Sequence, residues 1–401
     1  MNIAIWGYGT VGNGVAAVLD TNRELIERRA GVPLSIKYIL DLREFPGDRY
    51  EKNVVKDVDL ILNDPDVDII CETMGGNEPA YTFTKRALCA GKSVCTSNKE
   101  LVANHGAELI ALAKANNCSY LFEASVGGGI PIIRPLNDAL TAEKIVEISG
   151  ILNGTTNYIL TKMEREGAEF ADALKEAQDK GYAEKNPEAD VEGYDACRKI
   201  AILSSLTAQK NVDFRDIYTE GITRITSGDF DYAKAMDMTI KLLAVSREQD
   251  GAYLASVCPY MVSKENPLAG VNDVFNAVFV KGNTLGETMY YGKGAGKLPT
   301  ASAVMGDVVQ CAKHHGSHIQ VIWDDDRAQV LGYDDAQNQF FVRTAAEDTV
   351  LVGRLFGHVH EISLEEYPEE FGFITPLMTE KEAKEKFAQM PGLVTRIRIK
   401  A

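Results

Sequence analysis

Short apolar, β-branched runs alternate with longer amphipathic stretches over the first 130 residues. The runs have the length of strands buried on both faces, and the stretches between them have the length of helices. Such alternation builds right-handed crossover units and a parallel sheet with helices on both faces. The predicted strands are Asn2–Trp6, Leu34–Leu40, Leu60–Leu62, Asp68–Glu72, Ser93–Thr96 and Tyr120–Glu123. The predicted helices are Gly12–Ala30, Ala80–Ala90 and His105–Asn116.

The pattern changes at about residue 131, where long helices are followed by strand-like runs. We therefore expect a mixed α+β domain over residues 131–318, for catalysis and dimerisation, after an α/β domain over residues 1–130. The helix expected over residues 300–316 would pack back on the first domain. The predicted helices are Ala168–Lys180, Asp195–Ala208 and Tyr232–Val245, and the predicted strands are Tyr253–Pro259 and Asn276–Val280.

A second boundary lies at the apolar run Ile319–Trp323, which three aspartates follow. Beyond it, residues 319–401 are expected to form a third domain with the element order strand, helix, strand, strand, helix, strand. This is the order of a ferredoxin-like unit. The predicted elements are Gln339–Arg343, Val350–Phe356, His360–Leu364, Gly372–Thr375, Thr379–Met390 and Leu393–Ile399.

Composition narrows the range of functions. With 45% hydrophobic and 25% charged residues the chain is globular rather than disordered or fibrous. The 42 Lys and Arg against 58 Asp and Glu give a net charge of −16, which argues against nucleic acid and anionic membranes as partners. Seven dispersed cysteines, with no signal peptide and no apolar run of membrane-spanning length, predict a cytoplasmic protein with reduced thiols.

The first predicted strand leads directly into a glycine-rich turn and a helix. Gly7 suits a tight turn, Gly9 a close approach of the backbone to a pyrophosphate, and Gly12 close packing of helix on strand. Thr10 and Val11 open the helix, whose free N–H groups favour anions. The alternative is a glycine-rich structural turn, but the strand–turn–helix context favours a Rossmann-type dinucleotide site.

Two charged residues follow the second predicted strand. Asp41 stands where an acid binds the ribose 2′-hydroxyl of NAD, whereas Arg43 is suited to the 2′-phosphate of NADP. Both side chains are also typical of a solvated loop. The sequence therefore predicts NAD or NADP without choosing between them.

Two further loops follow predicted strands of this sheet, at the edge where open α/β sheets bind ligands. The first ends in Lys99, which from there reaches both a cofactor and a substrate. The second, Glu123–Pro131, holds three consecutive glycines beside a carboxylate and exposes carbonyls of the kind that bind hard cations. The alternatives are that Lys99 is an ordinary surface lysine and that Glu123–Pro131 is only a flexible turn.

The segment Gly181–Lys199 is a glycine- and proline-punctuated acidic loop that leads into a helix. Asp195 and Lys199 stand four residues apart on one face of that helix. An exposed pair of this kind contributes only about 0.3–0.5 kcal/mol. The helix continues with apolar residues, so we expect the pair to be partly buried, where desolvation disfavours the charged lysine and suits it to donate a proton.

Several of these segments, in order along the chain, resemble the homoserine dehydrogenase family. The resemblance covers roughly residues 3–315 and implies NAD(P)-dependent interconversion of L-homoserine and L-aspartate 4-semialdehyde, in threonine, methionine and isoleucine biosynthesis. The motifs that carry it are residues 96–99, 123–131, Gly150–Leu160, Gly181–Glu184, Asp195–Lys199 and Gly294–Ala301.

The resemblance also implies roles for individual residues. Lys199 is expected to act as proton donor and acceptor beside Asp195, with Lys99 as the alternative donor between nicotinamide and substrate. Glu184 would bind the substrate's amino group, and Asp190 is a further substrate-contacting acid. Thr73 and Gly296 would lie near the cofactor, and a monovalent cation such as sodium would be held by Glu123, Val126, Gly128 and Ile130.

The last domain resembles the ACT regulatory module that many of these dehydrogenases carry. It departs from that module after Thr344, where Ala345–Asp348 replaces the usual Asp-x-Pro-Gly turn for a ligand. L-threonine as an effector and a purely structural or dimerising role both remain open. We expect a small-molecule substrate and self-association as a homodimer or homotetramer.

Two other functions fit parts of the sequence. One is an NAD(P) oxidoreductase that acts on other amino or sugar acids, and the other is a nucleotide sensor without catalysis. The presence of Lys99, Glu184 and Lys199 argues against the sensor. A phosphorylating semialdehyde dehydrogenase would need an activated cysteine, and none of the seven stands in such a setting.

Overall fold

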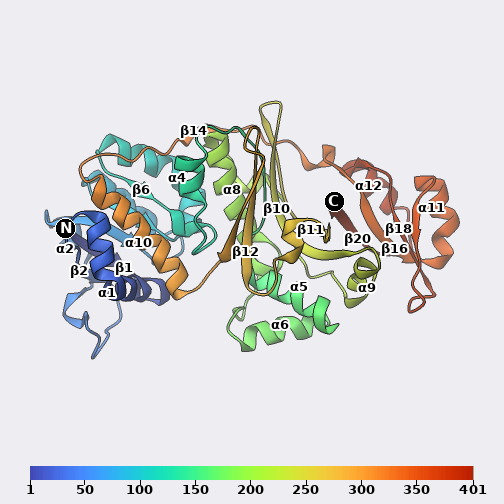
Figure 1. Cartoon of the computed structure of the whole chain (residues 1–401), viewed down its shortest axis with the longest axis horizontal. Coiled ribbons are helices and arrows are strands. Elements are labelled where there is room, and N and C mark those ends of the chain that lie inside the picture. Colours follow the sequence, from blue (N-terminus) through green and yellow to red (C-terminus); the bar gives the residue numbers. More distant parts are fainter. Residues whose placement is uncertain (401) are drawn as a thin grey trace.

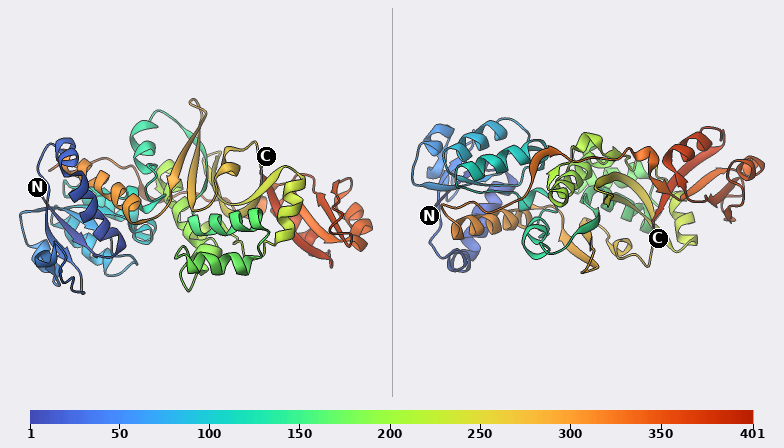
Figure 2. Two further views of the ribbon diagram at one scale, coloured as in Figure 1. Left: turned by 60° about the horizontal axis from the view of Figure 1, so that its bottom comes forward. Right: turned by 90° about the horizontal axis from the view of Figure 1, so that it is seen from above.

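The computed structural model describes residues 1–400, which form three parts in a row along the longest axis of the molecule (Figure 1). The N-terminal part lies at one end, a mixed sheet with its helices occupies the middle, and the C-terminal elements lie at the other end. Figure 2 shows the same succession from two further directions. The chain terminus returns to the middle part through the last strand (Figure 1).

The N-terminal part contains the predicted parallel sheet. Its six strands have the order β3-β2-β1-β4-β5-β6, and all five pairings are parallel. This is the order of a doubly wound dinucleotide-binding sheet. The strands are β1 (Asn2–Trp6), β2 (Ser35–Leu40), β3 (Val54–Val55), β4 (Val67–Glu72), β5 (Ser93–Thr96) and β6 (Tyr120–Leu121). The helices are α1 (Thr10–Ala30), α2 (Val58–Leu62), α3 (Ala80–Cys89) and α4 (Lys99–Ala115).

The prediction of a strand at Leu60–Leu62 is wrong, because these residues belong to helix α2. Val58, Ile61 and Leu62 are buried while Leu60 is 53% exposed, which is a helical and not an alternating pattern. The Asp57 side chain caps the helix by accepting a hydrogen bond from the Asp59 N–H in its first turn. An apolar run this short fits either element, and the cap decides between them.

Helix α10 (Lys297–Lys313) returns to the N-terminal part and packs against α1, and it begins and ends three residues earlier than the helix expected over residues 300–316. The two helices approach closely at Gly14, where a Cβ would lie 2.7 Å from the Lys297 carbonyl oxygen and 3.0 Å from the Ala301 Cβ. A residue larger than glycine would separate the helices. Late residues of the chain thus complete the nucleotide-binding part.

The middle part is built on a ten-stranded mixed sheet whose main path is β13-β12-β7-β10-β11-β20-β16-β18-β17, with β9 paired to β11. Helices α5 and α8 pack on one of its faces, toward the N-terminal part. The strands from the middle of the chain are β7 (Ile145–Ile151), β9 (Tyr218–Thr219), β10 (Met238–Gln249), β11 (Ala252–Ser263), β12 (Phe275–Gly282) and β13 (Glu287–Lys293). The helices are α5 (Gly154–Glu166), α6 (Phe170–Asp179), α7 (Glu188–Val191), α8 (Tyr194–Ala208) and α9 (Ser227–Ala235).

The predicted helix Tyr232–Val245 is wrong beyond its first turn. Helix α9 ends at Ala235, Asp237 turns the chain with a φ of 55°, and β10 begins at Met238. All twelve residues of β10 pair with β11. This long-range pairing overrides a local pattern that suits a helix equally well.

The C-terminal elements follow the predicted order. They are β16 (Phe340–Ala345), α11 (Thr349–Phe356), β17 (His360–Ile362), β18 (Glu370–Ile374), α12 (Glu380–Phe387) and β20 (Leu393–Lys400). Their strands have the order β20-β16-β18-β17, so β16 and β18 lie in the centre and the last strand, β20, lies at the edge of the four, next to β16. β20 also pairs in parallel with β11 through Tyr260 and Arg398, so these strands extend the middle sheet instead of forming a separate one.

Two buried arginines of the C-terminal strands reach acids of the middle part. Arg398 binds Glu380 of its own part and Glu220, with an Nη1–Oε2 distance of 2.7 Å to the latter. Arg343 binds Asp229 at 2.7 Å and also Glu370 of its own part. Because each guanidinium joins both parts, the C-terminal elements are fastened to the middle sheet by ion pairs as well as by β20.

All seven cysteines are free, as expected, and six of them are buried. Within residues 1–400, none of the helices combines the length and the apolar character needed to cross a bilayer.

Candidate active site

The glycine-rich turn lies between β1 and α1, at the carboxyl edge of the parallel sheet. Gly7 has a φ of 81°, which favours glycine, and Gly9 is the N-cap of α1. A Cβ on Gly12 would lie 2.0 Å from the Gly7 carbonyl oxygen, so only glycine fits there. Thr10 is exposed and Val11 half-buried at the start of the helix, whose free N–H groups therefore face an accessible surface.

Thr73, at the end of β4, is tied to this turn. Its hydroxyl donates to the carbonyl oxygens of Gly7 at 2.7 Å and Trp6 at 3.0 Å. The loop after β4 and the turn after β1 are thereby held together, as expected if both border one cofactor.

Asp41 and Arg43 are paired with each other. The Arg43 guanidinium donates to both carboxylate oxygens, at 3.0 and 2.8 Å, and the Tyr8 N–H donates to Oδ2 at 2.7 Å. These bonds, with that from Arg43 first, lower the pKa of Asp41 to about 2. The guanidinium lies 3.8 Å from the position of a Cβ on Gly9. Both residues therefore border the glycine-rich turn.

Asp195 joins two lysines from different parts of the molecule. Its Oδ1 lies 2.8 Å from the Nζ of Lys99, the first residue of α4. Its Oδ2 lies 2.6 Å from the Nζ of Lys199, one turn further along α8. The Lys199 ammonium also donates to the Leu152 carbonyl oxygen at 2.7 Å. The three predicted residues thus meet where the nucleotide-binding part faces the middle part.

Burial differs among these three groups. Only 5% of the Asp195 side chain and 11% of that of Lys199 is exposed, against 43% for Lys99. Burial opposes ionisation of Asp195, but the charges of Lys199 and Lys99 outweigh it and hold the pKa of Asp195 well below its usual range. The charge of Asp195 in turn raises the pKa of Lys99. The centre is one buried carboxylate between two ammonium groups.

Asn153 completes the centre, although the sequence assigned it no role. It is the N-cap of α5, where its Oδ1 accepts from the Thr156 N–H at 2.9 Å. This bond orients the amide, whose Nδ2 donates to Asp190 at 2.7 Å and to Asp195 at 2.8 Å. The Asn-Gly-Thr-Thr sequence after a strand signals the cap. Its contacts with the acids depend on tertiary structure.

Asp190 and Glu184 belong to the segment that joins α6 to α8. Burial raises the pKa of Asp190, which the Asn153 amide contacts. Glu184 is exposed, and within residues 1–400 its carboxylate makes no hydrogen bond or ion pair. The Thr155 hydroxyl donates to the Tyr182 carbonyl oxygen at 2.7 Å, so the loop of Glu184 is anchored at the start of α5, beside Asn153.

The loop Glu123–Pro131 packs against the start of α10. A Cβ on Gly128 would lie 2.5 Å from the Gly294 carbonyl oxygen, close to Gly296, the N-cap of α10. The Glu123 carboxylate is buried and satisfied by N–H groups: Ile132, Ile133 and Arg134 donate to it through their backbones, and Arg134 also through Nε at 3.0 Å. Val126 and Ile130 are buried as well.

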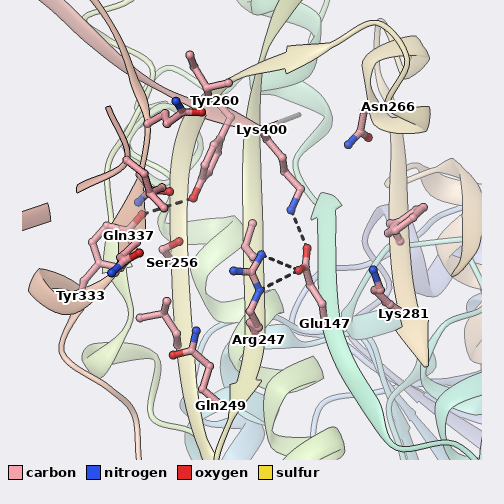
Figure 3. A pocket seen from close by; sticks show the side chains of 18 of the residues that line it. Glu147, Arg247, Gln249, Ser256, Tyr260, Asn266, Lys281, Tyr333, Gln337 and Lys400 are labelled. Carbon is pink, nitrogen blue, oxygen red and sulfur yellow. Dashed lines mark hydrogen bonds and ion pairs between the residues drawn. The ribbon is translucent and has the colours of Figure 1, made fainter. Parts of the chain in front are cut away.

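A cavity of about 1040 Å³ lies elsewhere, on the face of the mixed sheet away from α5 and α8 (Figure 3). At its floor Glu147 accepts from Arg247 at 2.8 Å and from Lys400 at 2.7 Å. None of the predicted catalytic or cofactor-binding residues lines it. The cavity is therefore separate from the lysine–aspartate centre.

The chain is similar to known proteins over most of its length. The family model of homoserine dehydrogenase matches residues 131–309, and that of the homoserine dehydrogenase NAD-binding domain matches residues 7–123. The homoserine dehydrogenase of Bacillus subtilis is 42% identical over 78% of this chain and 73% of its own length. That of Neisseria gonorrhoeae is 40% identical over 87% of this chain and 82% of its own.

Solved structures extend the similarity to the fold. A homoserine dehydrogenase from Thiobacillus denitrificans covers all of this chain and 98% of its own, with a TM-score of 0.92 and 33% identity. A hyperthermophilic archaeal homoserine dehydrogenase in complex with NADPH covers 77% of this chain and 97% of its own, with a TM-score of 0.65 and 30% identity. The chain therefore belongs to the homoserine dehydrogenase family of NAD(P)-dependent oxidoreductases.

Proposed function

We propose that the chain interconverts L-homoserine and L-aspartate 4-semialdehyde with NAD or NADP. The observation that carries the proposal is the contact of Asp195 with both Lys99 and Lys199, at the junction between the nucleotide-binding and middle parts. Reduction of a carbonyl needs a hydride on carbon and a proton on oxygen. A bound nicotinamide supplies or accepts the hydride.

Lys199 is the proposed proton donor and acceptor. An ammonium has three N–H groups, and that of Lys199 uses two of them on Asp195 and Leu152. The third is free for the substrate oxygen, and the two fixed bonds hold the group in place. Positioned proton transfer of this kind contributes about 10²–10⁴-fold to the rate. Lys99 remains the alternative donor, with one bond to Asp195 and a more exposed side chain.

The substrate's ammonium group is proposed to bind Glu184, supported by the free, exposed carboxylate of that residue. Asp190 would contact the substrate beside it, held by the Asn153 amide. Because Asn153 bonds both Asp190 and Asp195, one amide sets the distance between the substrate-binding acid and the proton-transfer centre.

Cofactor binding is proposed at the turn Gly7–Gly12, with Thr73 and Gly296 at its border. The choice between NAD and NADP depends on Asp41 and Arg43, which currently bind each other. A ribose hydroxyl would take a bond of Asp41, whereas a 2′-phosphate would bind Arg43. NAD would therefore bind Asp41 and NADP would bind Arg43, although the two residues now form an ion pair with each other.

A monovalent cation, sodium for example, is proposed at the loop 123–130. Among residues 1–400, no N–H group bonds to the backbone carbonyls of Val126, Gly128 or Ile130, although all three residues are buried. Buried carbonyls normally have partners, and carbonyl oxygens suit hard cations. The Glu123 carboxylate already accepts N–H bonds at both oxygens, so carbonyls would be the ligands. Activity in sodium against choline chloride tests this.

Self-association as a homodimer or homotetramer is proposed through the sheet face that carries the cavity of Figure 3. Met289 and Tyr291 pair with Phe279 and Ala277 of β12, which places them on that face, and they are 42% and 52% exposed. Exposed apolar side chains on an open sheet face favour a self-complementary interface. Light scattering of the wild type and of Tyr291→Lys tests the proposal: a variant of unchanged mass would contradict it.

The C-terminal elements are proposed to be an ACT-like domain, residues 319–401, after domains at 1–130 and 131–318. The order β20-β16-β18-β17 supports this. Whether L-threonine binds is tested by calorimetric titration together with inhibition assays. A cytoplasmic location is also proposed, supported by the seven free thiols.

The decisive test of function is spectrophotometric. Purified protein is assayed for oxidation of L-homoserine with NAD and with NADP in parallel, and for other hydroxy acids at the same concentrations. Turnover selective for homoserine is expected. Equal or greater turnover on another hydroxy acid would overturn the assignment of substrate, and tight nucleotide binding without turnover would favour the sensor.

A further inference from the structure

Glu72 is a buried acid to which the mechanism above gives no role. It is the last residue of β4, at the carboxyl edge of the parallel sheet, and its exposed fraction is 0%. Within residues 1–400 no lysine, arginine or histidine pairs with it. Burying a carboxylate without a cation costs free energy unless the carboxylate is well hydrogen-bonded, so hydrogen bonds must stabilise Glu72.

The partners of Glu72 come from two different loops. The Met74 N–H donates to Oε1 at 2.8 Å, from the loop that begins at Thr73. The Thr96 hydroxyl donates to Oε2, from the end of β5. Thr96 Oγ1 also accepts from the Asn98 N–H at 2.9 Å, so this hydroxyl joins Glu72 to the start of α4. In its ionised form Glu72 accepts at both oxygens.

On the β5 side, the chain of bonds ends at Lys99, the alternative proton donor. The Asn98 Oδ1 accepts from the Leu101 N–H at 3.1 Å and so caps α4, whose first residue is Lys99. The Asn98 Nδ2 donates back to the Gly76 carbonyl oxygen at 2.6 Å. The backbone conformation at Lys99 is thus set by the cap that Glu72 supports through Thr96.

On the β4 side, the bonds end at the cofactor loop. Met74 lies against the glycine-rich turn, since a Cβ on Gly7 would be 3.0 Å from its Cα. The neighbouring Thr73 hydroxyl binds the Gly7 carbonyl oxygen at 2.7 Å. The segment Thr73–Gly76 is therefore held to the turn by Thr73, to Glu72 by Met74, and to Asn98 by Gly76.

We propose that Glu72 is a positioning residue for the hydride-transfer reaction. It holds the cofactor loop 73–76 and the start of α4 in one fixed relation, so that the Lys99 ammonium meets Asp195 beside the nicotinamide site. This inference rests on the proposed function, because it assigns Lys99 to the reaction. A misplacement of about 1 Å in such a site costs on the order of 10²-fold in rate.

Glu72→Gln tests the proposal because it keeps the shape of the side chain and replaces one acceptor oxygen with an N–H donor. The Gln amide nitrogen faces either the Met74 N–H or the Thr96 hydroxyl, each of which donates to the ionised Glu72. We expect kcat to fall by about 10- to 100-fold, and the dissociation constant for NADPH, measured by fluorescence without homoserine, to rise. The matched control is Glu380→Gln, which alters an equally buried acid in the C-terminal part and should lower Tm but keep kcat.

A double-mutant cycle separates positioning from general stability. If Glu72 acts through Lys99, the variant with both Glu72→Gln and Lys99→Ala loses no more kcat than Lys99→Ala alone. The proposal would be overturned if the loss of kcat in the double variant equalled the product of the two single losses. It would also be overturned if Glu72→Gln kept wild-type kcat and NADPH affinity. If Glu72→Gln does not fold, Thr96→Val removes the hydroxyl that donates to Glu72, and the same changes in kcat and NADPH affinity are expected.

The proposed substrate and the role of Glu72 fail in distinguishable ways. Absence of homoserine turnover in the wild type contradicts the proposed function. NADPH affinity still reports on the loop that Glu72 holds, and an unchanged affinity in Glu72→Gln would then contradict the positioning role.

Discussion

Asp195 and Lys199 lie one helical turn apart on α8, with an Oδ2–Nζ distance of 2.6 Å and side chains that are 5% and 11% exposed. An exposed pair at this spacing stabilises a helix only slightly. Here the pair is buried, shares its carboxylate with Lys99, and faces the Asn153 amide. This geometry is the basis of the proton transfer proposed above.

Lys199→Ala removes the proposed proton donor. We expect turnover of homoserine to fall by about 10²–10⁴-fold, while nucleotide affinity stays the same because the glycine-rich turn is untouched. Steady-state kinetics and NADPH fluorescence titration measure the two effects. Lys185→Ala, on the exposed acidic loop, is the matched control. Near wild-type turnover of Lys199→Ala would transfer the role to Lys99.

Asp195→Asn keeps the size of the side chain and removes its charge. The charge of Asp195 raises the pKa of Lys99, so its loss should lower that pKa, and Lys99 should lose its proton at a lower pH. In the direction of semialdehyde reduction, which needs a protonated lysine, the basic limb of the kcat/KM profile is then expected to move to lower pH, with a lower maximum. A limb at the wild-type position would show that the ionisation of Lys99 does not limit the reaction.

Arg43→Ala separates the two cofactors. A charged hydrogen bond of the kind that Arg43 would make to a 2′-phosphate contributes about 1.5–3 kcal/mol, so we expect KM for NADP to rise. Without Arg43 the pKa of Asp41, now about 2, should rise toward its usual value, and its carboxylate becomes free for a ribose hydroxyl. KM for NAD should therefore stay constant or fall. Equal increases for both cofactors would contradict a role in discrimination.

Arg398→Met tests how the C-terminal strands are held. The change leaves the fully buried Glu380 without its cation, and breaking a buried pair in this way costs about 3–5 kcal/mol. Thermal unfolding should show a clear fall in Tm. Arg396→Met, on the same strand but only partly buried, is the control and should change Tm little. Equal effects of the two substitutions would exclude a special contribution from the buried network.

The two segments whose secondary structure was predicted wrongly share one property. Leu60–Leu62 and Tyr232–Val245 are apolar stretches whose local pattern fits a helix or a strand. A capping carboxylate decided the first, and pairing of β10 with β11 decided the second. The other predicted strands and helices of the first 130 residues are present, because each βαβ unit is nearly local in sequence, although the short strand β3 was missed and α4 begins at Lys99 instead of His105.

The sequence by itself determined the parallel sheet, the glycine-rich turn, the family, and the pairing of Asp195 with Lys199, since each depends on residues a few positions apart or on ordered motifs. Only the tertiary structure decided that Lys99 shares the carboxylate of Asp195 and that Asn153 joins the two acids. It also decided that β20 continues the middle sheet. These contacts join residues far apart along the chain, and their energies depend on burial, which a local pattern does not encode.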